Sequence, residues 1–310
     1  MLPAYNDERW LPYAIESTLA QTQRAFELLL INDGSSDGTL ALMNAYAKRD
    51  PRIRVLSHEN YGVARTLNEA LHAARTDWVM RMDADDVMAP NRIERQLAFL
   101  EQHPEAAVIA CLPIYINEAG DEIGRKARAR FTAPGVALRA SERGEVIQIL
   151  HSGALIRRHA VLGVGGYRAE FDKVEDIELW GRLVDAGHEV LEQPEYLVHY
   201  RFRRASVSGG DYALQQRQLR WVAYCAAQRR VGLPEPSFQQ FHALERSGSR
   251  LRTLNLSRKD FANDRFHRAL WTYANGSRWR AANDVLVSSI LDPTRALQRI
   301  GPKVLSTLRS

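Results

Sequence analysis

Short apolar runs that end in acidic turns are the feature that most constrains the fold of this chain. Residues 26–32 (FELLLIN) form an apolar run of strand length, and the acidic, glycine-rich turn Asp33–Thr39 follows at once. A run of this kind is typical of a strand that is covered on both faces, as in a parallel sheet. Because helical patterns alternate with such runs over the first 120 residues, the sequence predicts an α/β fold with a parallel sheet.

The same pattern predicts further elements along the chain. Residues 52–57 and 78–82 are expected to be strands, and an apolar stripe with helical spacing lies between them over residues 63–74. A helix is expected after Pro90, because proline is favoured at helix starts. We expect a hairpin turn at residues 117–121, followed by an Arg-rich mobile loop that extends to about residue 143.

Charge divides the chain into two parts. Residues 201–310 hold 20 Lys and Arg against 7 Asp and Glu, whereas residues 1–200 hold 22 against 30. The acidic part could hold a metal, and the basic part suits an anionic membrane surface, with a solvated basic face as an equal alternative. We expect an α/β domain over residues 1–205 and a helical region over residues 206–310. Three of its aromatic residues, Phe266, Trp271 and Trp279, are expected to lie in a core rather than to act as membrane anchors.

Composition indicates the compartment. No apolar run approaches the ~18 residues that a membrane-spanning helix needs, and the first residues do not have the character of a signal peptide. Cys111 and Cys225 are far apart in the sequence, which favours neither a disulfide framework nor a zinc site. We expect a cytoplasmic protein that could lie peripherally at the inner face of the membrane.

Asp33 is the first candidate site residue. Ligands of open α/β sheets bind beyond the carboxyl ends of the strands, so Asp33 is expected to project into a crevice. There its carboxylate could accept a hydrogen bond from the edge of a nucleobase. Gly34 and Gly38 permit a sharp turn, and Asp37 or Thr39 could cap the next helix. A capped turn without a ligand is the alternative.

An acidic cluster follows the predicted strand at residues 78–82. Asp83, Asp85 and Asp86 lie within four positions, and their mutual repulsion is costly unless a cation or hydrogen-bond donors lie among them. Oxygen ligands alone favour a hard ion, Mg²⁺ or Mn²⁺, over zinc. One carboxylate could bind the ion while another reaches a bound water or a ribose hydroxyl. A loop of solvated acids is the alternative.

A third acidic group lies at the start of a predicted helix. Glu175 and Asp176 precede an apolar stripe formed by Ile177, Trp180 and Val184, and a pair of glycines lies about ten residues earlier. Taken alone, Asp176 would be interpreted as a helix cap, which is a common use of aspartate.

In their order, these segments resemble the motifs of the family 2 glycosyltransferases. The matching segments are Pro3–Asn6, Asn32–Thr39, Asn60–Arg65 with Asn68, Met82–Asp86 with Pro90, Arg92 and Gln96, and Gly165–Leu183. They cover about residues 3–208, and their common order makes the resemblance specific. The resemblance implies the GT-A fold, a mixed sheet flanked by helices, and an inverting enzyme that uses a nucleotide-sugar donor.

The resemblance also implies roles for individual residues. Asp33 would bind the nucleobase, and Asp83 the ribose or a metal-bound water. Asp85 would bind the Mg²⁺ or Mn²⁺ ion that bridges the diphosphate, and Asp176 would be the base that deprotonates the acceptor hydroxyl. The remaining implied site residues are Pro3, Tyr5, Asn6 and Arg65 around the nucleotide sugar, and Gly166, Tyr167 and Glu175 on the acceptor side.

Two departures from the family pattern refine the expected function. The late element Tyr-Arg-x-His is replaced here by residues 200–203 (YRFR), where Arg203 could meet phosphate in place of the histidine. In residues 216–221 (QRQLRW) the glutamines are out of register for the Gln-x-x-Arg-Trp motif of processive polysaccharide synthases. We therefore expect addition of a single sugar from a UDP-linked donor to a glycan or lipid-linked glycan.

Two other functions are alternatives. The sequence pI of about 9.3 would suit a nucleic-acid-binding protein, but no recognition motif accompanies the charge, and the acidic clusters would repel phosphate. A nucleotidyltransferase could also combine an α/β sheet with a metal. We expect the glycosyltransferase, with no nucleic acid among its partners. Release of UDP rather than pyrophosphate would separate the two enzymes.

Overall fold

The computed structural model describes residues 1–203, 212–247, 250–274 and 276–293. They form two compact units, one of residues 1–201 with 222–233 and the other of residues 202–221 with the described part of 234–310. The long helix α9 (Tyr212–Arg230) contributes residues to both units. The expected domain boundary at residue 205 stays a prediction.

A parallel three-stranded sheet begins the first unit. Its strands are β1 (Leu2–Ala4), β2 (Leu28–Asp33) and β3 (Ile53–His58), in this order. Leu30 of β2 lies opposite both Leu2 and Val55. Every residue of β2 is buried, as expected for the apolar run from which it was predicted.

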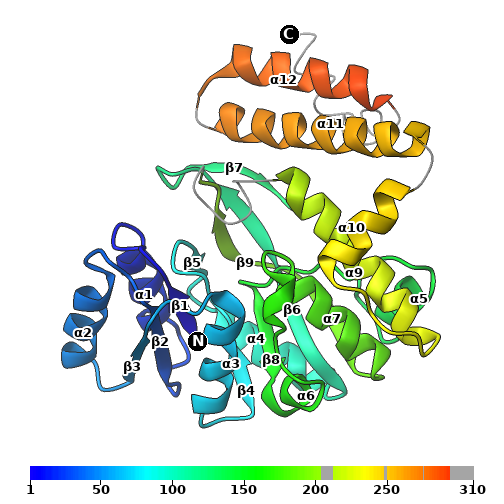
Figure 1. Ribbon diagram of the computed structural model, residues 1–310. Coiled ribbons are helices and arrows are strands. Elements are labelled where there is room, and N and C mark those ends of the chain that lie inside the picture. The colour runs from blue at the N-terminus through cyan, green and yellow to red at the C-terminus, as the bar shows by residue number, and fades with distance from the viewer. Residues whose placement is uncertain (204–211, 248–249, 275, 294–310) are drawn as a thin grey trace. The chain divides into compact units, whose positions relative to one another are not determined.

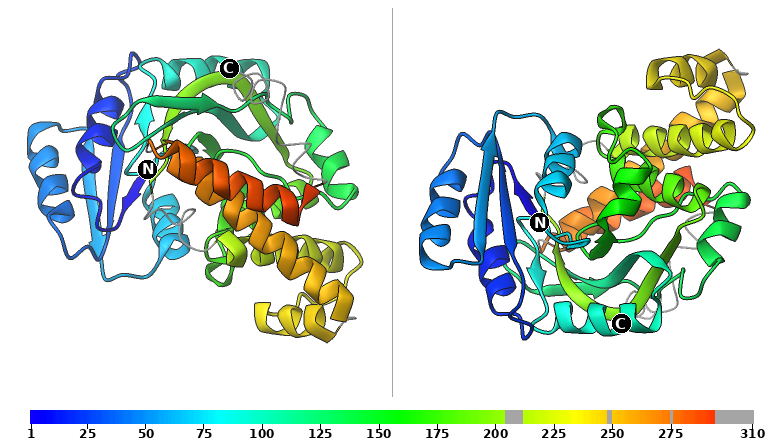
Figure 2. Two further views of the ribbon diagram at one scale, coloured as in Figure 1. Left: turned by 90° about the horizontal axis from the view of Figure 1, so that it is seen from above. Right: turned by 90° about the horizontal axis from the view of Figure 1, so that it is seen from below.

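Helices cover both faces of this sheet, because successive β2 side chains point to opposite sides (Figures 1 and 2). Leu29 and Ile31 share a core with α3, and Leu28 and Leu30 share another core with α1 and α2. The helices are α1 (Leu11–Leu19), α2 (Thr39–Arg49) and α3 (Val63–Ala73). This layered arrangement confirms the α/β class.

The second sheet is mixed, in the order β4-β8-β6-β9-β5, with β7 paired to β6. Its strands are β4 (Trp78–Met80), β5 (Val87–Met88), β6 (Ala106–Ile116), β7 (Glu122–Arg125), β8 (Ala154–Arg157) and β9 (Glu189–Arg201). Among the strand pairs of this sheet in the described residues, β6 with β9 is parallel and the others are antiparallel. The mixed sheet is therefore confirmed, and β4 pairs antiparallel with β8, a strand that lies beyond the first 120 residues for which a parallel sheet was expected.

Met1 joins the two sheets. Its amine donates to Met80 O at 2.7 Å, and the Met82 amide donates to Met1 O at 3.1 Å. Met1 thus bonds to two residues of the neighbouring segment, Met80 and Met82, which lie two positions apart. Hydrogen bonds of this kind are typical of parallel strands. The carboxyl ends of β2 and β4, which carry the turn after Asp33 and the acidic cluster, therefore lie at the same edge.

The remaining helices of the first unit are α4 (Arg92–Gln102), α5 (Val136–Glu142), α6 (Arg158–Gly163), the short 3-10 helix η1 (Ala169–Phe171) and α7 (Glu175–Asp185). The predicted hairpin turn at 117–121 is confirmed between β6 and β7. The loop predicted to extend to residue 143 is wrong in part. Residues 136–142 form α5, because Ala137 and Ala140 pack one small apolar face into the core.

The second unit is helical. Besides part of α9 it contains α10 (Phe238–Ser247), α11 (Arg250–Ala274) and α12 (Arg278–Leu291). Across the described ranges, no helix combines the length and the apolar character needed to cross a membrane. The expected core position is wrong for Trp279, which is 90% exposed, while Phe266 is half-buried. The side chain of Trp271 lies outside the described residues.

Candidate active site

Asp33 lies at the carboxyl end of β2, and its side chain is buried. Its Oδ1 accepts a hydrogen bond from the Tyr61 amide at 2.7 Å, and its Oδ2 accepts one from the Gly62 amide at 3.1 Å. His58 Nδ1 lies 3.5 Å from Oδ1, and the His58 ring stacks on Tyr61 with centroids 4.9 Å apart. Asp33 therefore has the predicted position, and it also fixes the start of α3.

The turn after Asp33 is bound to the opening segment of the chain. Asn6 accepts the Ser36 amide at 2.8 Å through Oδ1, and its own amide donates to Ser35 Oγ at 3.0 Å. Gly34 has a positive φ of 67°, and a Cβ there would lie 2.4 Å from the amide nitrogen of Asn60. Glycine is thus required where two backbones approach closely. Asn6 therefore stabilises the turn through its backbone and its side chain.

The other residues implied around the donor are placed as follows. Pro3 is half-buried in β1, and Tyr5 and Arg65 are exposed. The N-cap residue of α2 is Gly38, which lies between the two expected caps, Asp37 and Thr39. Asp37 still stabilises the helix start, because its Oδ1 accepts the Thr39 amide at 3.0 Å.

Three carboxylates meet after β4. Asp83, Asp85 and Asp86 each offer an oxygen, and these oxygens lie within 4.8 Å of one another. Burial, and then the charges of Asp85 and Asp83, raise the pKa of Asp86 well above its ordinary value. Such repulsion in a set of oxygen ligands fits a hard divalent cation, which would relieve it. The solvated loop considered as the alternative is wrong, because Asp85 and Asp86 are buried.

Arg201 at the end of β9 binds both a side chain and the backbone of this acidic loop. Its amide donates to Asp86 Oδ1 at 2.8 Å, and its Nε donates to Asp85 O at 2.9 Å. Its guanidinium lies 4.5 Å above the Trp10 ring, a cation–π distance. Arg201 was part of the segment 200–203 seen in the sequence, but its role there was missed. A phosphate contact by Arg203 stays a prediction.

Asp176 is the second residue of α7, and Val174 is the N-cap residue. The capping interpretation of Asp176 is therefore wrong. Burial raises the pKa of Asp176 to about 6, against the opposing effects of the Ile177 amide and Arg81. Burial, and then the charge of Asp176, raise the pKa of Glu175 to about 8. At neutral pH the pair thus holds one proton, on Glu175, and Asp176 has a pKa suited to a general base.

Tyr167, in the loop that precedes α7, is also buried. Its phenol is 2.8 Å from Nε2 of His151, and burial raises its pKa. Partial burial, and then the charge of Arg81, hold the pKa of His151 well below its ordinary value, so its ring is neutral. Asn68 of α3 fixes the loop from both sides, accepting the Tyr167 amide and donating to Tyr167 O, each at 2.8 Å. Gly166 has a positive φ of 69°, and a Cβ there would lie 2.5 Å from Asn68 Oδ1, so that position favours glycine.

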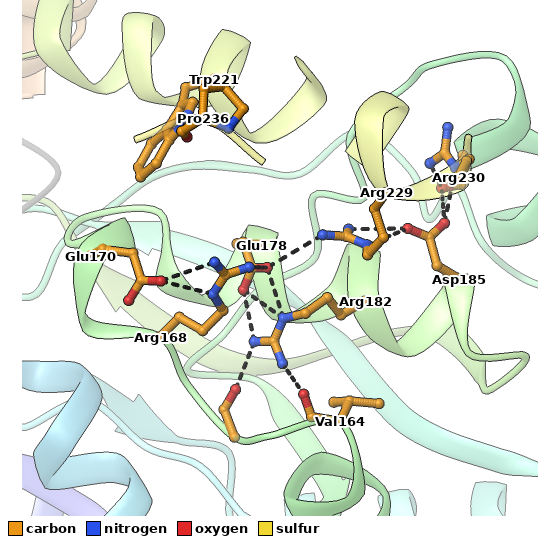
Figure 3. A network of polar contacts seen from close by, with 12 residues as sticks. Val164, Arg168, Glu170, Glu178, Arg182, Asp185, Trp221, Arg229, Arg230 and Pro236 are labelled. Atoms are coloured by element: carbon orange, nitrogen blue, oxygen red, sulfur yellow. Dashed lines mark hydrogen bonds and ion pairs between the residues drawn. The ribbon is translucent and has the colours of Figure 1, made fainter. Parts of the chain in front are cut away.

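Arg182 connects the same loop to α7 (Figure 3). It donates to Val164 O at 2.5 Å and to Gly166 O at 2.6 Å, and its charge is balanced by Glu178 at 2.7 Å. Arg229 of α9 also approaches Glu178, at 3.8 Å. A buried pair with this many hydrogen bonds holds the loop that contains Val164 and Gly166 on the helix that carries Asp176. The sequence showed no signal for this arrangement beyond the i,i+4 spacing of the pair.

Arg81 is the central residue that the sequence interpretation missed. It is buried and forms an ion pair with Asp83. Its positive charge also lowers the pKa values of Glu175 and Asp176, although burial is the larger effect at both. A charge within the otherwise apolar segment 78–82 was the available signal. Arg81 therefore connects the acidic cluster electrostatically with the start of α7.

We expect Arg81→Met to raise the pKa of Asp176 further, since the variant removes a charge that lowers it. A base must be deprotonated to act, so the acidic limb of the kcat profile should move to higher pH. Measuring kcat against pH for the wild type, Arg81→Met and the charge-retaining Arg81→Lys checks this. A limb that stays in place in Arg81→Met would contradict it.

Solved structures show which class of protein has this fold. S. aureus TarS 1-349 in complex with UDP-GlcNAc matches with a TM-score of 0.59 and 16% identity, over 93% of this chain and 90% of that chain. The mannosyltransferase PcManGT from Pyrobaculum calidifontis, in complex with GDP-Man and Mn²⁺, matches with a TM-score of 0.56 and 16% identity, over 95% and 86%. The fold is the GT-A fold of glycosyltransferases.

Proteins with similar sequences belong to the same class. The putative glycosyltransferase EpsE of Bacillus subtilis (strain 168) is 32% identical over 201 residues, which cover 64% of this chain and 70% of that protein. The amylovoran biosynthesis glycosyltransferase AmsE of Erwinia amylovora is 29% identical over 204 residues, covering 65% and 74%. The family model of glycosyl transferase family 2 matches residues 1–164, more than half of the chain. This chain therefore belongs to glycosyl transferase family 2, and it is a glycosyltransferase.

Proposed function

We propose that the enzyme transfers a single sugar from a UDP-linked donor to a hydroxyl of a glycan or lipid-linked glycan, with inversion at the anomeric carbon. One observation carries the proposal. The acidic cluster after β4 and the carboxylate of Asp176 both lie within the electrostatic reach of Arg81. A candidate diphosphate site and a candidate base thus belong to one centre.

The residues that would bind the donor lie in two turns, one after β2 and one after β4. Asp33 would accept hydrogen bonds from the nucleobase, with oxygens whose second lone pairs are free of its two amide contacts. Asp83 would contact the ribose or a metal-bound water, and Asp85 would hold Mg²⁺ or Mn²⁺. When bound, such an ion would stabilise the negative charge of the departing diphosphate. The oxygen-only ligand set supports a hard cation.

The acceptor side would carry the proton transfer. Asp176 accepts the proton of the acceptor hydroxyl while that oxygen bonds to the anomeric carbon, and the bond from this carbon to the diphosphate breaks. One displacement from the opposite side inverts the configuration. Glu175, with a pKa of about 8, stays protonated at neutral pH and leaves the anionic role to Asp176.

The named relatives support the substrate classes. TarS was crystallised with UDP-GlcNAc, and PcManGT is in complex with GDP-Man and Mn²⁺, so the fold accommodates nucleoside-diphosphate sugars with either base. AmsE is named for amylovoran biosynthesis, which fits a glycan acceptor. A lipid-linked acceptor would place the reaction at a membrane surface, and we propose the cytoplasmic face.

A direct test is the product of donor consumption. We expect the enzyme, incubated with Mn²⁺ and a panel of UDP- and GDP-sugars, to release a nucleoside diphosphate from one of them. Release should accelerate when glycan or lipid-linked glycan acceptors are added. Chromatography of the nucleotide products measures this. Pyrophosphate as the product would favour a nucleotidyltransferase instead.

A further inference from the structure

The helix α12 carries its polar side inward and its apolar side outward. Ala281, Asp284 and Ser288 are buried, whereas Trp279, Leu286 and Ile290 are 90%, 59% and 69% exposed. Residues seven and eleven positions apart lie on one face of a helix, so these three apolar side chains share one exposed face, together with the exposed Asn283, opposite the buried side. An ordinary surface helix has the reverse pattern. We call this stripe, Trp279, Leu286 and Ile290, the α12 stripe.

The buried polar side of α12 is satisfied by α11, its antiparallel neighbour (Figure 1). Asp284 accepts a hydrogen bond from Arg265 Nη1 at 2.7 Å. Ala262 and Ala269 of α11 are buried and small, which lets the two helices approach closely. The inward side of α12 therefore has its partners within the second unit, and the orientation of the helix is set by hydrogen bonds and close packing.

The charged residues of α11 and α12 also differ between the buried and the exposed sides of these helices. All four acidic residues of the segment 250–293 are turned inward or paired. They are Asp260, Asp284 and Asp292, which are buried, and Asp264, which pairs with Arg268 at 2.9 Å. Arg258, Lys259 and Arg280, by contrast, are exposed. The exposed side of α12 thus carries apolar side chains with Arg280 next to Trp279 in the chain, and Arg258 and Lys259 add exposed positive charge on α11.

We propose that the α12 stripe docks onto the surface of an anionic phospholipid bilayer. Indole rings favour the boundary between headgroups and acyl chains, and leucine and isoleucine side chains favour the acyl region below it. Arg280 follows Trp279 directly and would meet the anionic headgroups, which attract basic residues near the surface. A protein partner would need acidic and apolar groups in a matching pattern, whereas an anionic bilayer offers both along its whole surface.

Vesicle flotation of the full chain tests this proposal. We expect the wild type to float with vesicles that contain phosphatidylglycerol, and much less with vesicles of phosphatidylcholine alone. Replacing the α12 stripe in the triple variant Trp279→Ser, Leu286→Ser, Ile290→Ser should lower the partition coefficient for anionic vesicles at least tenfold. Arg280→Glu should weaken binding to anionic vesicles while leaving neutral vesicles unaffected.

A matched control is Val231→Ser, because Val231 is also apolar and 68% exposed but lies in the first unit. This control should float like the wild type. Donor hydrolysis in solution and circular dichroism should be unchanged in all variants, so a failure of docking is separate from a failure of transfer. Equal binding to both vesicle types, or a triple variant that floats normally, overturns the proposal. So does a wild-type dimer that the triple variant dissociates in sedimentation, which would assign the stripe to a second copy.

Discussion

Asp176→Asn is expected to lower kcat by roughly 10²–10⁴-fold, the usual contribution of a general base, while metal-dependent donor binding stays nearly intact. Asparagine keeps the shape of the side chain but cannot accept the proton. Val174 occupies the N-cap position, and asparagine can still accept the Ile177 amide, so the substitution tests proton acceptance separately from that hydrogen bond. Single-turnover kinetics with saturating donor and acceptor measure the loss at the chemical step.

The pH profile of the wild type supplies a second measurement of the same base. The pKa of Asp176 is raised to about 6, so the proton is bound below that pH and activity should fall as the pH falls through about 6. Glu175→Gln is the matched control, because the native side chain is protonated at neutral pH and glutamine preserves a neutral group. If Glu175→Gln abolishes transfer and Asp176→Asn spares it, the base is Glu175.

The fold was largely predictable because its elements follow local pattern. The apolar run at residues 26–32 became the fully buried β2, and the helical stripe after Gly62 became α3. The pairing of β4 was not predictable, since its partner β8 comes more than seventy residues later. Periodicity reports which face of a strand is buried, but it carries no information about which strand lies beside it. Helix α5 was taken for part of a loop because it is short and lies in an Arg-rich stretch without a clear helical pattern.

The residues of the candidate site also divide into those that local sequence indicated and those that it did not. Asp33, Asp85 and Asp176 could be proposed as site residues because each lies at or shortly after the end of a predicted strand, or at the start of a predicted helix. Arg81 and Arg201 were missed, because their importance comes from contacts between distant segments. Arg201 reaches the acidic loop across 116 positions of sequence to Asp85.

The pKa of Asp176 was the quantity least accessible from sequence. The N-terminus of a helix alone would lower it, which would make Asp176 a weaker base. Burial outweighs that effect in the structure and raises the pKa to about 6. A neighbouring carboxylic acid, Glu175, is raised further and keeps its proton at neutral pH, so the two groups avoid carrying two negative charges in one buried place.

Asp85→Ala is expected to abolish both the metal dependence of UDP binding and the transfer activity. At a UDP concentration one hundred times the dissociation constant, binding adds about 2.7 kcal/mol to the free energy of unfolding. The wild type should therefore show a clear rise in Tm with UDP and Mn²⁺ together, and little with UDP alone. In the variant the carboxylates of Asp83 and Asp86 stay, but the cluster loses one of its three oxygen ligands.

Differential scanning fluorimetry with UDP, Mn²⁺ and EDTA measures this effect. Glu142→Ala is the control for loss of one carboxylate, because Glu142 is exposed on α5 and away from the cluster in sequence. That variant should keep the full metal-dependent shift. A Tm shift with UDP that survives EDTA in the wild type, or one that Asp85→Ala retains in full, would show that the acidic cluster does not hold the ion. The diphosphate would then have to be neutralised by cationic side chains, with Arg81 the first to replace.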